Sequence, residues 1–296
     1  MVEVADGVYA YTQPPGGWCL SNAGVILGPD GVLVIDTLAT ERRARRLLES
    51  VERLHPGPGR MIVNTHHHGD HSFGNHVFGP STAIMAHELA RAEMATTGLA
   101  LTQLWPGVEW GDVRVTLPNV TFRDRLTVYL GDKRVELIHV GPAHTFNDVV
   151  VWLAEDEVLF AGDVVLAGST PFNLMGSVRG ALVAVDQLRA MGARTVVCGH
   201  GPVTGPGVFD ETEGYLRWIL ELAAEGTACG LTPLEVARAS DLREFGHLLD
   251  PERIVGNLHR AYDEVSGSEP LRPLDVVGVF AEMVEYNGGR LPTCLA

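Results

Sequence analysis

Histidine and aspartate are concentrated in one short segment of this chain. Residues 65–71 read Thr-His-His-His-Gly-Asp-His and directly follow the apolar run 61–63, which is expected to be a buried strand. In a loop of this kind His66 and His68, two positions apart, can bind one metal ion. Gly69 permits the sharp turn that presents the next two residues to a second ion. One segment could therefore serve two metals.

Three more potential ligands each lie just beyond a predicted strand. His144 stands in GPAHT after RVELIHV, Asp163 in AGDVV after EVLFAG, and His200 in CGHGP after TVV. Loops at the ends of strands can meet at one edge of a sheet. The sequence therefore predicts that these residues join the first segment around a common site.

Counting donors divides the set into two metal sites. One zinc ion would take three nitrogens, from His66, His68 and His144. The other would be held by Asp70, His71 and His200, with Asp163 bridging the two. Two ions about 3.5 to 4 Å apart can lower the pKa of water to around 7 and polarise a carbonyl. Asp70 and Asp163 are the candidate catalytic carboxylates.

The same donor set has other interpretations. Nitrogen and carboxylate ligands without cysteine also suit manganese or iron. A zinc-stabilised binding or scaffolding protein is disfavoured, because structural zinc sites are usually closed, mononuclear and rich in cysteine. A single histidine beside an apolar strand is more often a hydrogen-bonded structural residue than a ligand. We expect this of His55, His76, His87, His139, His247 and His259, and we expect His67 to face away from the ions.

The elements that must position these residues alternate between short strands and helices. Strands are predicted at 8–12, 23–28, 31–37, 60–65, near 120, and at 126–130, 134–140, 148–154, 157–162 and 195–199. Helices are predicted at 39–54, 86–98 and 178–192, followed by a nearly continuous helical tail over 208–286 with breaks near Pro233, Pro251 and Pro270. Strands in two batches, each followed by helices, predict two sheets packed face to face with helices outside, a four-layer α/β fold. We expect a catalytic domain at 1–207 and a helical extension at 208–296 packed on the same core.

Composition and charge narrow the function classes. The 296 residues carry 37 acidic and 22 basic side chains, a net charge of −15, so a phosphate backbone would be repelled and nucleic acid is a poor candidate substrate. We find neither an apolar run long enough to span a bilayer nor a basic and apolar export signal, and we expect no membrane partner and a cytoplasmic protein. The four cysteines form no CxxC pair and are expected to be reduced and mostly buried.

The motifs resemble those of the metallo-β-lactamase superfamily, through THHHGDH at 65–71, GPAHT at 141–145, AGD at 161–163 and GHG at 199–201. The resemblance covers about residues 8–205. It implies an αββα sandwich with a dinuclear site at the edge of its two sheets, and hydrolysis as the default chemistry. It also favours zinc, because diiron members of the family generally carry a glutamate where this chain has His68.

A closer resemblance covers nearly the whole chain. GGWCLSNAGV at 16–25, LTQLWPGVEWGDV at 101–113, PNVTFRDRLTVYLG at 118–131, VGPAHTFNDVVVWL at 140–153 and YNGGRLPTCLA at 286–296 resemble the second- and third-ring cyclases of bacterial type II aromatic polyketide pathways. This resemblance implies ring closure on a polyketide intermediate, carried by an acyl carrier protein or free, with thioester hydrolysis in some members. The sequence leaves open whether cyclisation, hydrolysis or both occur.

A polycyclic substrate would need an apolar, aromatic cleft above the metals. The candidates in loops beside the motifs are Trp18, Trp105, Trp110, Phe146, Phe172 and Leu174. A group of basic residues on predicted helices has two interpretations, a solvated face paired with glutamates or a docking surface for an acidic carrier protein. It comprises Arg42, Arg43, Arg45, Arg46, Arg238, Arg243 and Arg253.

Other metallo-hydrolases remain as alternatives: a glyoxalase-II-like thioesterase, a lactonase or a β-lactamase. The missing export signal argues against a β-lactamase, and the charge argues against a nuclease. We also expect a homodimer through the helical tail, because that tail carries more apolar positions than a small cap needs.

Overall fold

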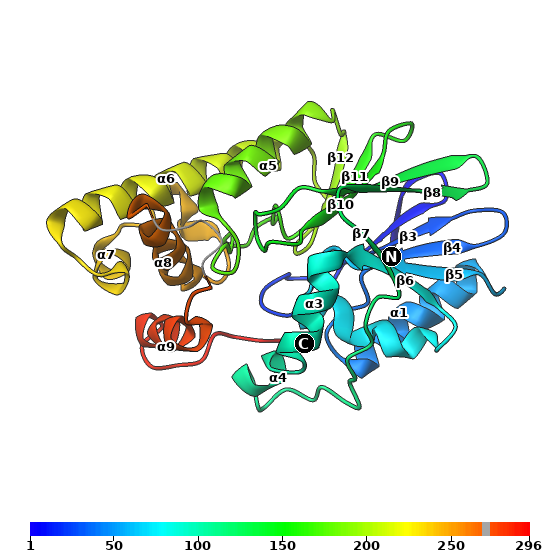
Figure 1. Ribbon diagram of the computed structural model, residues 1–296, viewed down its shortest axis with the longest axis horizontal. Helices are drawn as coiled ribbons and strands as arrows, with labels where there is room; N and C mark the ends of the chain where they lie inside the picture. The colour runs from blue at the N-terminus through cyan, green and yellow to red at the C-terminus, as the bar shows by residue number, and fades with distance from the viewer. Residues whose placement is uncertain (268–272) are drawn as a thin grey trace.

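The structure is a computed structural model that describes residues 1–267 and 273–296. Two β-sheets face each other, and helices cover their outer faces (Figure 1). This confirms the predicted four-layer α/β fold. The two sheets provide the strand ends on which the candidate ligands stand.

The first sheet is built from the N-terminal part of the chain. Its strands lie in sequence order: β1 (Val2–Ala5), β2 (Val8–Tyr11), β3 (Ala23–Leu27), β4 (Val32–Ile35), β5 (Arg60–Val63), β6 (Ala83–His87) and β7 (Val120–Phe122). From β4 to β7 neighbouring strands are parallel, whereas β1 to β4 are antiparallel. The carboxyl ends of β4 and β5 therefore meet at one edge.

The second sheet continues the chain. Its order is β12 (Thr195–Cys198), β11 (Val158–Gly162), β10 (Val149–Leu153), β9 (Lys133–His139) and β8 (Arg125–Leu130). Strand β10 runs antiparallel to both β9 and β11, and β12 is parallel to β11. Strands β9, β11 and β12 therefore end at the same edge of this sheet.

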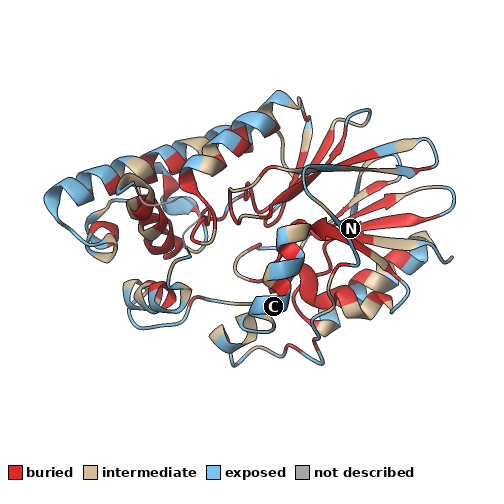
Figure 2. Ribbon diagram, in the orientation of Figure 1, coloured by how far each residue is buried: buried red, intermediate tan, exposed pale blue. Residues whose placement is uncertain are grey.

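Alternation of side chains along the strands produces separate layers of core. In β4, Leu33 and Ile35 belong to the buried cluster between the sheets, whereas Val32 and Val34 pack on the helical side. Buried side chains line both sheets and the inner faces of the helices (Figure 2). Each fully buried aliphatic side chain contributes about 1.5–3 kcal/mol to stability.

The helices cover the two outer faces. They are α1 (Glu41–Leu54), α2 (Gly69–Ser72), the 3-10 helix η1 (Phe73–Phe78), α3 (Glu88–Thr97), α4 (Leu101–Leu104), α5 (Val178–Ala190), α6 (Gly207–Cys229), α7 (Pro233–Ala239), the 3-10 helix η2 (Arg243–His247), α8 (Arg253–Val265) and α9 (Val276–Tyr286). Helix α1 begins at its N-cap Thr40 and buries Leu47 and Val51 against the first sheet. One buried cluster continues from the second sheet through α5 and α6 into α8 and α9.

Two strands were not predicted from the sequence. Strand β1 has an exposed, irregularly paired segment, so it lacks a clear apolar pattern. Strand β6 reads AIMAH, and alanine and methionine favour helices, so the predicted helix at 86–98 begins only at Glu88.

The helical tail is interrupted as expected near Pro233 and Pro251, whereas the break expected near Pro270 lies outside the described residues. In the described part of the chain, no helix is both long and apolar enough to cross a membrane.

Candidate metal centre

The predicted ligands lie on loops that leave the two facing strand edges. Residues 66–71 follow β5, whereas His144 follows β9, Asp163 follows β11 and His200 follows β12. All seven predicted ligand side chains are brought together there. Six of them are buried and His68 is half-buried.

Three imidazoles form one corner of the site. The ligand atoms of His66, His68 and His144 lie within 4.8 Å of one another. Nδ1 of His68 lies 2.9 Å from Nε2 of His144. No carboxylate belongs to this group, so it offers an ion only nitrogen, as predicted from the donor count.

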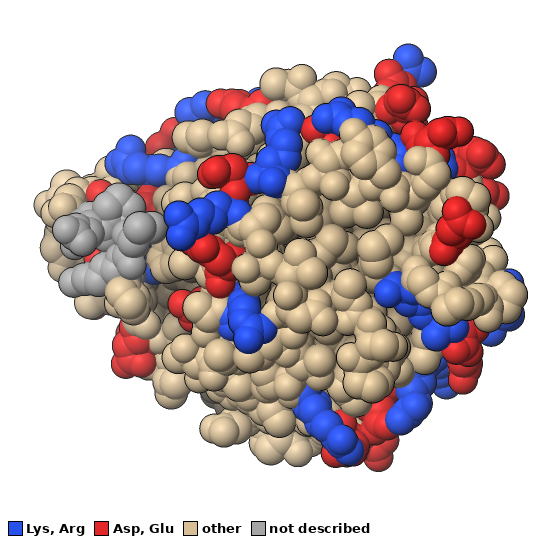
Figure 3. Space-filling view, turned by 45° about the vertical axis from the view of Figure 1, so that its right-hand side comes forward, with Lys and Arg blue, Asp and Glu red and all other residues tan. Residues whose placement is uncertain are grey.

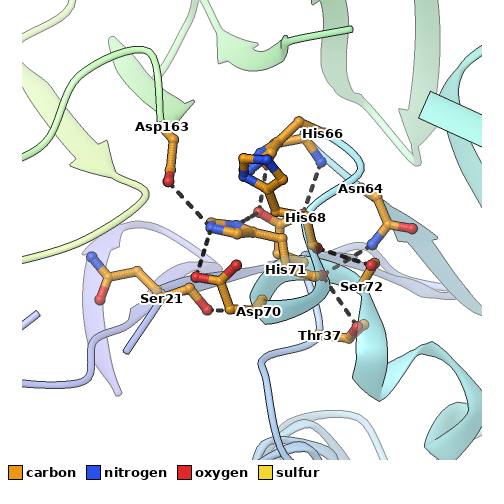
Figure 4. Close-up of polar contacts among 12 residues, drawn as sticks. Ser21, Thr37, Asn64, His66, His68, Asp70, His71, Ser72 and Asp163 are labelled. Carbon is orange, nitrogen blue, oxygen red and sulfur yellow. Dashed lines mark hydrogen bonds and ion pairs between the residues drawn. The ribbon is translucent and has the colours of Figure 1, made fainter. Parts of the chain in front are cut away.

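The second group combines carboxylates with imidazoles. Asp70, His71 and His200 also have ligand atoms within 4.8 Å of one another. Nε2 of His71 points between two carboxylates, 3.2 Å from Oδ1 of Asp163 and 3.7 Å from Oδ2 of Asp70 (Figure 4). Oδ2 of Asp70 is also 3.4 Å from Nε2 of His200.

Asp163 lies between the two groups. One oxygen, Oδ2, is 3.5 Å from Nε2 of His144 and 3.4 Å from Nε2 of His200, whereas Oδ1 faces His71. This is the location expected of a bridging ligand. Position 199, in the neighbouring loop, must be glycine, because a Cβ there would overlap Oδ1 of Asp163.

Hydrogen bonds to the opposite ring nitrogen orient the imidazoles of His144 and His200. Nδ1–H of His144 donates to the carbonyl oxygen of Phe172, and Nδ1–H of His200 donates to that of Gly17 at 3.1 Å. Because a carbonyl oxygen can only accept, Nδ1 must carry a proton, and in the neutral ring that metal binding requires the lone pair on Nε2 faces the site. This arrangement is typical of histidines that bind metal.

Asp36 performs the same task for His71 and was missed by the sequence analysis. Its Oδ2 accepts a hydrogen bond from Nδ1 of His71 at 2.7 Å and another from Oγ1 of Thr65 at 2.7 Å. Asp36 has a left-handed backbone with φ of 59°, a conformation that costs about 1–2 kcal/mol for most non-glycine residues. It follows β4 directly, but the strand was predicted to run to residue 37, so Asp36 was not recognised as a residue of a strand-end loop.

The residues present fit a pair of divalent cations. Nε2 of His66 is buried without a hydrogen-bond partner among the described residues, although its Nδ1 contacts Oγ1 of Thr65 at 3.0 Å. Three carboxylates, those of Asp36, Asp70 and Asp163, are buried together, and no lysine or arginine pairs with them in the described part of the chain. Buried charges are normally paired or bound to metal.

The pKa values of the histidines also show that the buried carboxylates favour positive charge at this site. Burial would lower the pKa of His200, but the carboxylates of Asp163 and Asp70 raise it to about 9. Burial likewise opposes protonation of His71, yet Asp163, Asp70 and Asp36 together raise its pKa well above the usual value. Burial and the neighbouring imidazoles lower the pKa of His66, which therefore stays neutral as a ligand must be.

The remaining histidines lie outside these groups. His67 turns to Asn147, whose amide contacts its Nδ1 at 3.1 Å, and burial lowers the pKa of His67 to about 4. His55, His76, His139, His247 and His259 each contact a carbonyl or carboxylate oxygen. Gly69, which was expected to permit a sharp turn, does not have a left-handed backbone. It is needed because a Cβ there would overlap the ring of Phe73.

A cavity that is partly open to solvent lies above the metal ligands. Its floor contains His68, Asp70, His144, Asp163 and His200. Its walls are mainly apolar and include four of the predicted side chains: Trp18, Trp105, Phe172 and Leu174. The sequence analysis missed further wall residues from distant segments, namely Cys19, Leu101, Leu104, Met175, Arg253, Val276 and Phe280.

Two predicted wall residues were wrong. Trp110 is buried beside Phe73, with its Nε1 donating to the carbonyl oxygen of Trp105 at 3.2 Å, so it supports the wall from behind. Phe146 lines a separate cavity beside His67. Both residues were predicted to line the cavity because they lie in loops that carry a motif. A position in such a loop does not determine where the side chain points.

The predicted basic group is dispersed in the structure. Arg45 pairs with Glu41 at 2.6 Å and Arg238 with Glu285 at 2.9 Å, as expected of a solvated face. Arg253, in contrast, is buried: its guanidinium lies 4.1 Å from the ring centre of Trp18 and pairs with Asp250 at 3.0 Å. Basic and acidic side chains are interspersed on the face shown in Figure 3.

Comparison with known proteins agrees with this geometry. A family model described as the metallo-β-lactamase superfamily matches residues 16–200. The chain is similar to a linear primary-alkylsulfatase from Pseudomonas sp., with 26% identity over 72% of this chain and 48% of that protein. It is also similar to a hydroxyacylglutathione hydrolase from Methylococcus capsulatus, with 31% identity over 47% of each chain. The chain thus spans about half the length of these relatives.

A solved structure supports the fold over most of the chain. A metallo-β-lactamase family protein from Thermus thermophilus superposes with a TM-score of 0.66 over 90% of this chain and 95% of that one. The sequence identity is 22%. The shared arrangement therefore includes the helical tail beyond residue 207 in large part, but at this identity it shows the fold alone.

Proposed function

The chain belongs to the metallo-β-lactamase superfamily, and we propose that it is a two-zinc cyclase, thioesterase or both, acting on an aromatic polyketide intermediate that is free or bound to an acyl carrier protein. The observation that carries this proposal is the cavity, because it places apolar and aromatic walls directly above the carboxylates and imidazoles of the metal centre. Relatives in the superfamily are metal-dependent hydrolases.

The walls favour a flat and largely apolar substrate. Trp18 packs against Trp105 with ring centres 5.4 Å apart and against Phe172 at 5.2 Å. Phe280 from α9 extends the same surface, with its ring centre 5.5 Å from that of Trp105. Aromatic surfaces of this kind bind aromatic rings through offset and edge contacts.

Three of the five segments that resemble polyketide cyclases, 16–25, 101–113 and 140–153, line this cavity. Residues 16–25 contribute Trp18 and Cys19, and residues 101–113 contribute Leu101, Leu104 and Trp105. The segment at 286–296 touches them, because Nε1 of Trp105 donates to the carbonyl oxygen of Pro292 at 2.7 Å. Segment 118–131 contributes no residue to the cavity lining, so only part of the resemblance lies where substrate would bind.

The chain's own residues have separate tasks. His66, His68 and His144 would hold one metal ion and Asp70, His71 and His200 the other, with Asp163 between them. When bound, the two ions would lower the pKa of a water molecule towards about 7 and polarise a substrate carbonyl. Asp70 and Asp163 line the cavity, so the ions that they would help to hold would lie beside the substrate carbonyl and its acidic carbon. Trp18 and Trp105 exclude water from that carbon.

The cavity also suits a leaving group that needs no added proton. Apart from the proposed ligands, the ionisable side chains that line it in the described part of the chain are Cys19 and Arg253. Neither is a ready proton donor, because an arginine stays protonated and the pKa of the Cys19 thiol is raised. A thiolate can leave unprotonated, since its conjugate acid has a pKa of about 8.5.

A simple thioesterase is the second candidate. The similarity to a hydroxyacylglutathione hydrolase over 47% of the chain favours it. The two functions are separated by assays on a polyketide thioester, a glutathione thioester, a lactone and a chromogenic cephalosporin. We expect kcat/KM to be at least about 100-fold higher for the polyketide thioester than for the other three substrates. Of these substrates, it is the one whose rings would pack against the aromatic walls.

The decisive experiment is product analysis by mass spectrometry after the metal-loaded protein is added to a reconstituted aromatic polyketide system. We expect a new cyclised product, release of the carrier thiol, or both, and neither with the Asp163→Ala variant. Rapid turnover of any of the simple substrates, with no change in the polyketide product, would overturn the proposal.

A further inference from the structure

Two cysteines from opposite ends of the sequence meet beside the metal cavity. Cys19 lies in the loop between β2 and β3, is 2% exposed and lines the cavity wall. Cys294 is the third residue from the end of the chain and is half-buried against the same apolar cluster. The two thiols are close enough to shift each other's pKa, upward for Cys19 and downward for Cys294. Neither thiol has a task in the proposed reaction.

Cys294 is carried by a segment that crosses from one helix layer to another. We call residues 287–296 the C-terminal strap. After α9 the strap runs back towards α3 and α4 (Figure 1). Trp105, at the end of α4, donates to the carbonyl oxygen of Pro292 at 2.7 Å, and Nη2 of Arg43 in α1 donates to that of Leu295 at 2.6 Å.

These contacts place Cys294 between two anchors. Both anchors use backbone carbonyl oxygens, so they hold the strap whatever side chain stands at position 294. On the other side, the loop that carries Cys19 is closed by a hydrogen bond from the amide of Leu20 to the carbonyl oxygen of Gly17 at 3.0 Å. Cys19 itself has a left-handed backbone with φ of 61°, so this loop is held in a defined conformation. The two thiols are therefore held together by the surrounding backbone.

We propose that Cys19 and Cys294 form an oxidation site, at which a hydroperoxide such as hydrogen peroxide converts the two thiols into a disulfide that fastens the C-terminal strap to the wall of the metal cavity. The proposal is independent of the substrate. It would hold for any enzyme that uses this cavity.

The reaction balances with hydrogen peroxide as the oxidant. The thiolate of Cys294 attacks one peroxide oxygen, which breaks the O–O bond and gives a sulfenic acid and hydroxide, and the hydroxide takes up a proton to become water. The sulfur of Cys19 then attacks the sulfenic sulfur, loses its proton and displaces a second hydroxide, which leaves as water. The two sulfurs lose two electrons in total, and the peroxide oxygens gain them.

Cys294 is the better first nucleophile. It is the more exposed of the two, and the neighbouring Cys19 thiol lowers its pKa, which increases the thiolate fraction. Cys19 is buried, so it is suited to resolve the sulfenic acid. The other cysteines do not share this arrangement: Cys198 is buried as the last residue of β12, and Cys229 is exposed at the end of α6.

Peptide mapping of the metal-loaded full chain tests the proposal. After treatment with a small excess of hydrogen peroxide and blocking of free thiols, trypsin should release the peptide of residues 1–42 joined to that of residues 291–296, because it cleaves after Arg42 and Arg290. Reduction should separate the two peptides. Titration should find two of the four thiols lost.

Variants distinguish the pair from unspecific oxidation. Cys294→Ser and Cys19→Ser should each abolish the joined peptide, whereas Cys229→Ser, the matched control, should leave it unchanged. Circular dichroism checks that each variant folds, and Cys294→Ser changes only a residue close to the chain end. Sulfinic acid at Cys294 without the joined peptide, a disulfide between two chains through Cys229, or no oxidation in a folded chain would each overturn the proposal.

Limited proteolysis tests whether the disulfide fastens the strap. Arg290 lies exposed at the start of the strap, so brief trypsin treatment of the native reduced protein should cut after it. Oxidation should slow that cut by about ten-fold or more, because cleavage requires local opening of the strap. An equal cleavage rate in the oxidised and reduced forms would show that the disulfide does not restrain the strap. Cys294→Ser should show no effect of peroxide.

Discussion

The metal centre and the cavity wall above it are built in opposite ways. Each predicted ligand stands in the segment that follows the end of a strand, by at most about eight residues, and parallel neighbours bring those ends to one edge. The wall, in contrast, combines side chains from the N-terminal loop, α4, α8 and α9, which are separated by up to about the whole chain. The floor is a local property of the sequence, whereas the wall is a property of the tertiary fold.

The largest effect on metal content and activity should come from replacing a metal ligand in the floor of the cavity. The residue next to it in the sequence serves as the control. His66→Ala removes a nitrogen of the three-histidine group and should lower metal content by about one ion per chain and activity by about 1000-fold or more. His67→Gln, one position away, should keep both ions because His67 faces Asn147. Elemental analysis and kcat measure this. Equal metal content in the two variants would refute the assignment of ligands.

The next effect tests the support beneath the floor. Asp36→Asn retains the shape and tolerates the left-handed backbone, but it removes the charge that Nδ1–H of His71 faces. We expect metal affinity to fall about 10- to 100-fold, as is usual when such a partner is lost. Competition with a chelator gives the affinity. An unchanged value would mean that Asp36 serves only the backbone of Thr65.

The wall should affect substrate more than metal. Leu104→Asp introduces a carboxylate into the cavity and should lower kcat/KM by about ten-fold or more, with no change in metal content. Leu99→Asp lies just before α4, is already 36% exposed and does not line the cavity, so it is the matched control. Loss of metal in Leu104→Asp, or equal losses of activity in both variants, would contradict the separation of wall and floor.

The smallest effect concerns a histidine at a strand end that holds no metal. His87 ends β6 and stacks on His139, with ring centres 3.9 Å apart, and burial followed by that neighbour lowers the pKa of His87 to about 4. Glu88 and Asp124 oppose this only in part. The unfolded chain therefore binds more protons between about pH 6.5 and 4, so His87 lowers the stability of the folded state as the pH falls through that window.

The replacement His87→Asn keeps an acceptor at the N-cap of α3, where the side chain of His87 now accepts from the amide of Leu89. It should recover about 1 kcal/mol or less of the stability lost between pH 7.5 and pH 5. Urea unfolding at the two pH values measures the difference. A larger loss of stability between pH 7.5 and pH 5 in the variant than in the wild type would contradict this prediction.

The contrast between floor and wall also explains which features the sequence predicted. The fold and the grouping of the seven ligands follow from strand periodicity and strand-end loops, which are local signals. Asp36 was missed because the strand was predicted to run to residue 37, whereas β4 ends at Ile35, and because it lies outside the segments rich in histidine or glycine that indicated the other ligands. Arg253 was assigned to the surface because a charged residue in an amphipathic helix usually lies there, yet Asp250 and Trp18 hold it inside.

Side-chain direction in loops was the least predictable feature. Trp105 and Trp110 lie in one segment, and only Trp105 reaches the cavity, because the backbone between them turns Trp110 toward Phe73. Phe280 and Val276 could not be assigned to the wall from sequence, since nothing local indicates that α9 returns to the metal centre. Long-range packing decides these positions.

Metal stoichiometry and ligand type test the central claim most directly. Elemental analysis of the purified chain, combined with X-ray absorption at the metal edge, counts the ions and identifies the atoms bound to them. The account predicts two ions per chain, predominantly zinc, with nitrogen and oxygen ligands and no sulfur. Fewer than one ion per chain after metal loading, or sulfur from Cys19 or Cys198 among the ligands, would contradict it.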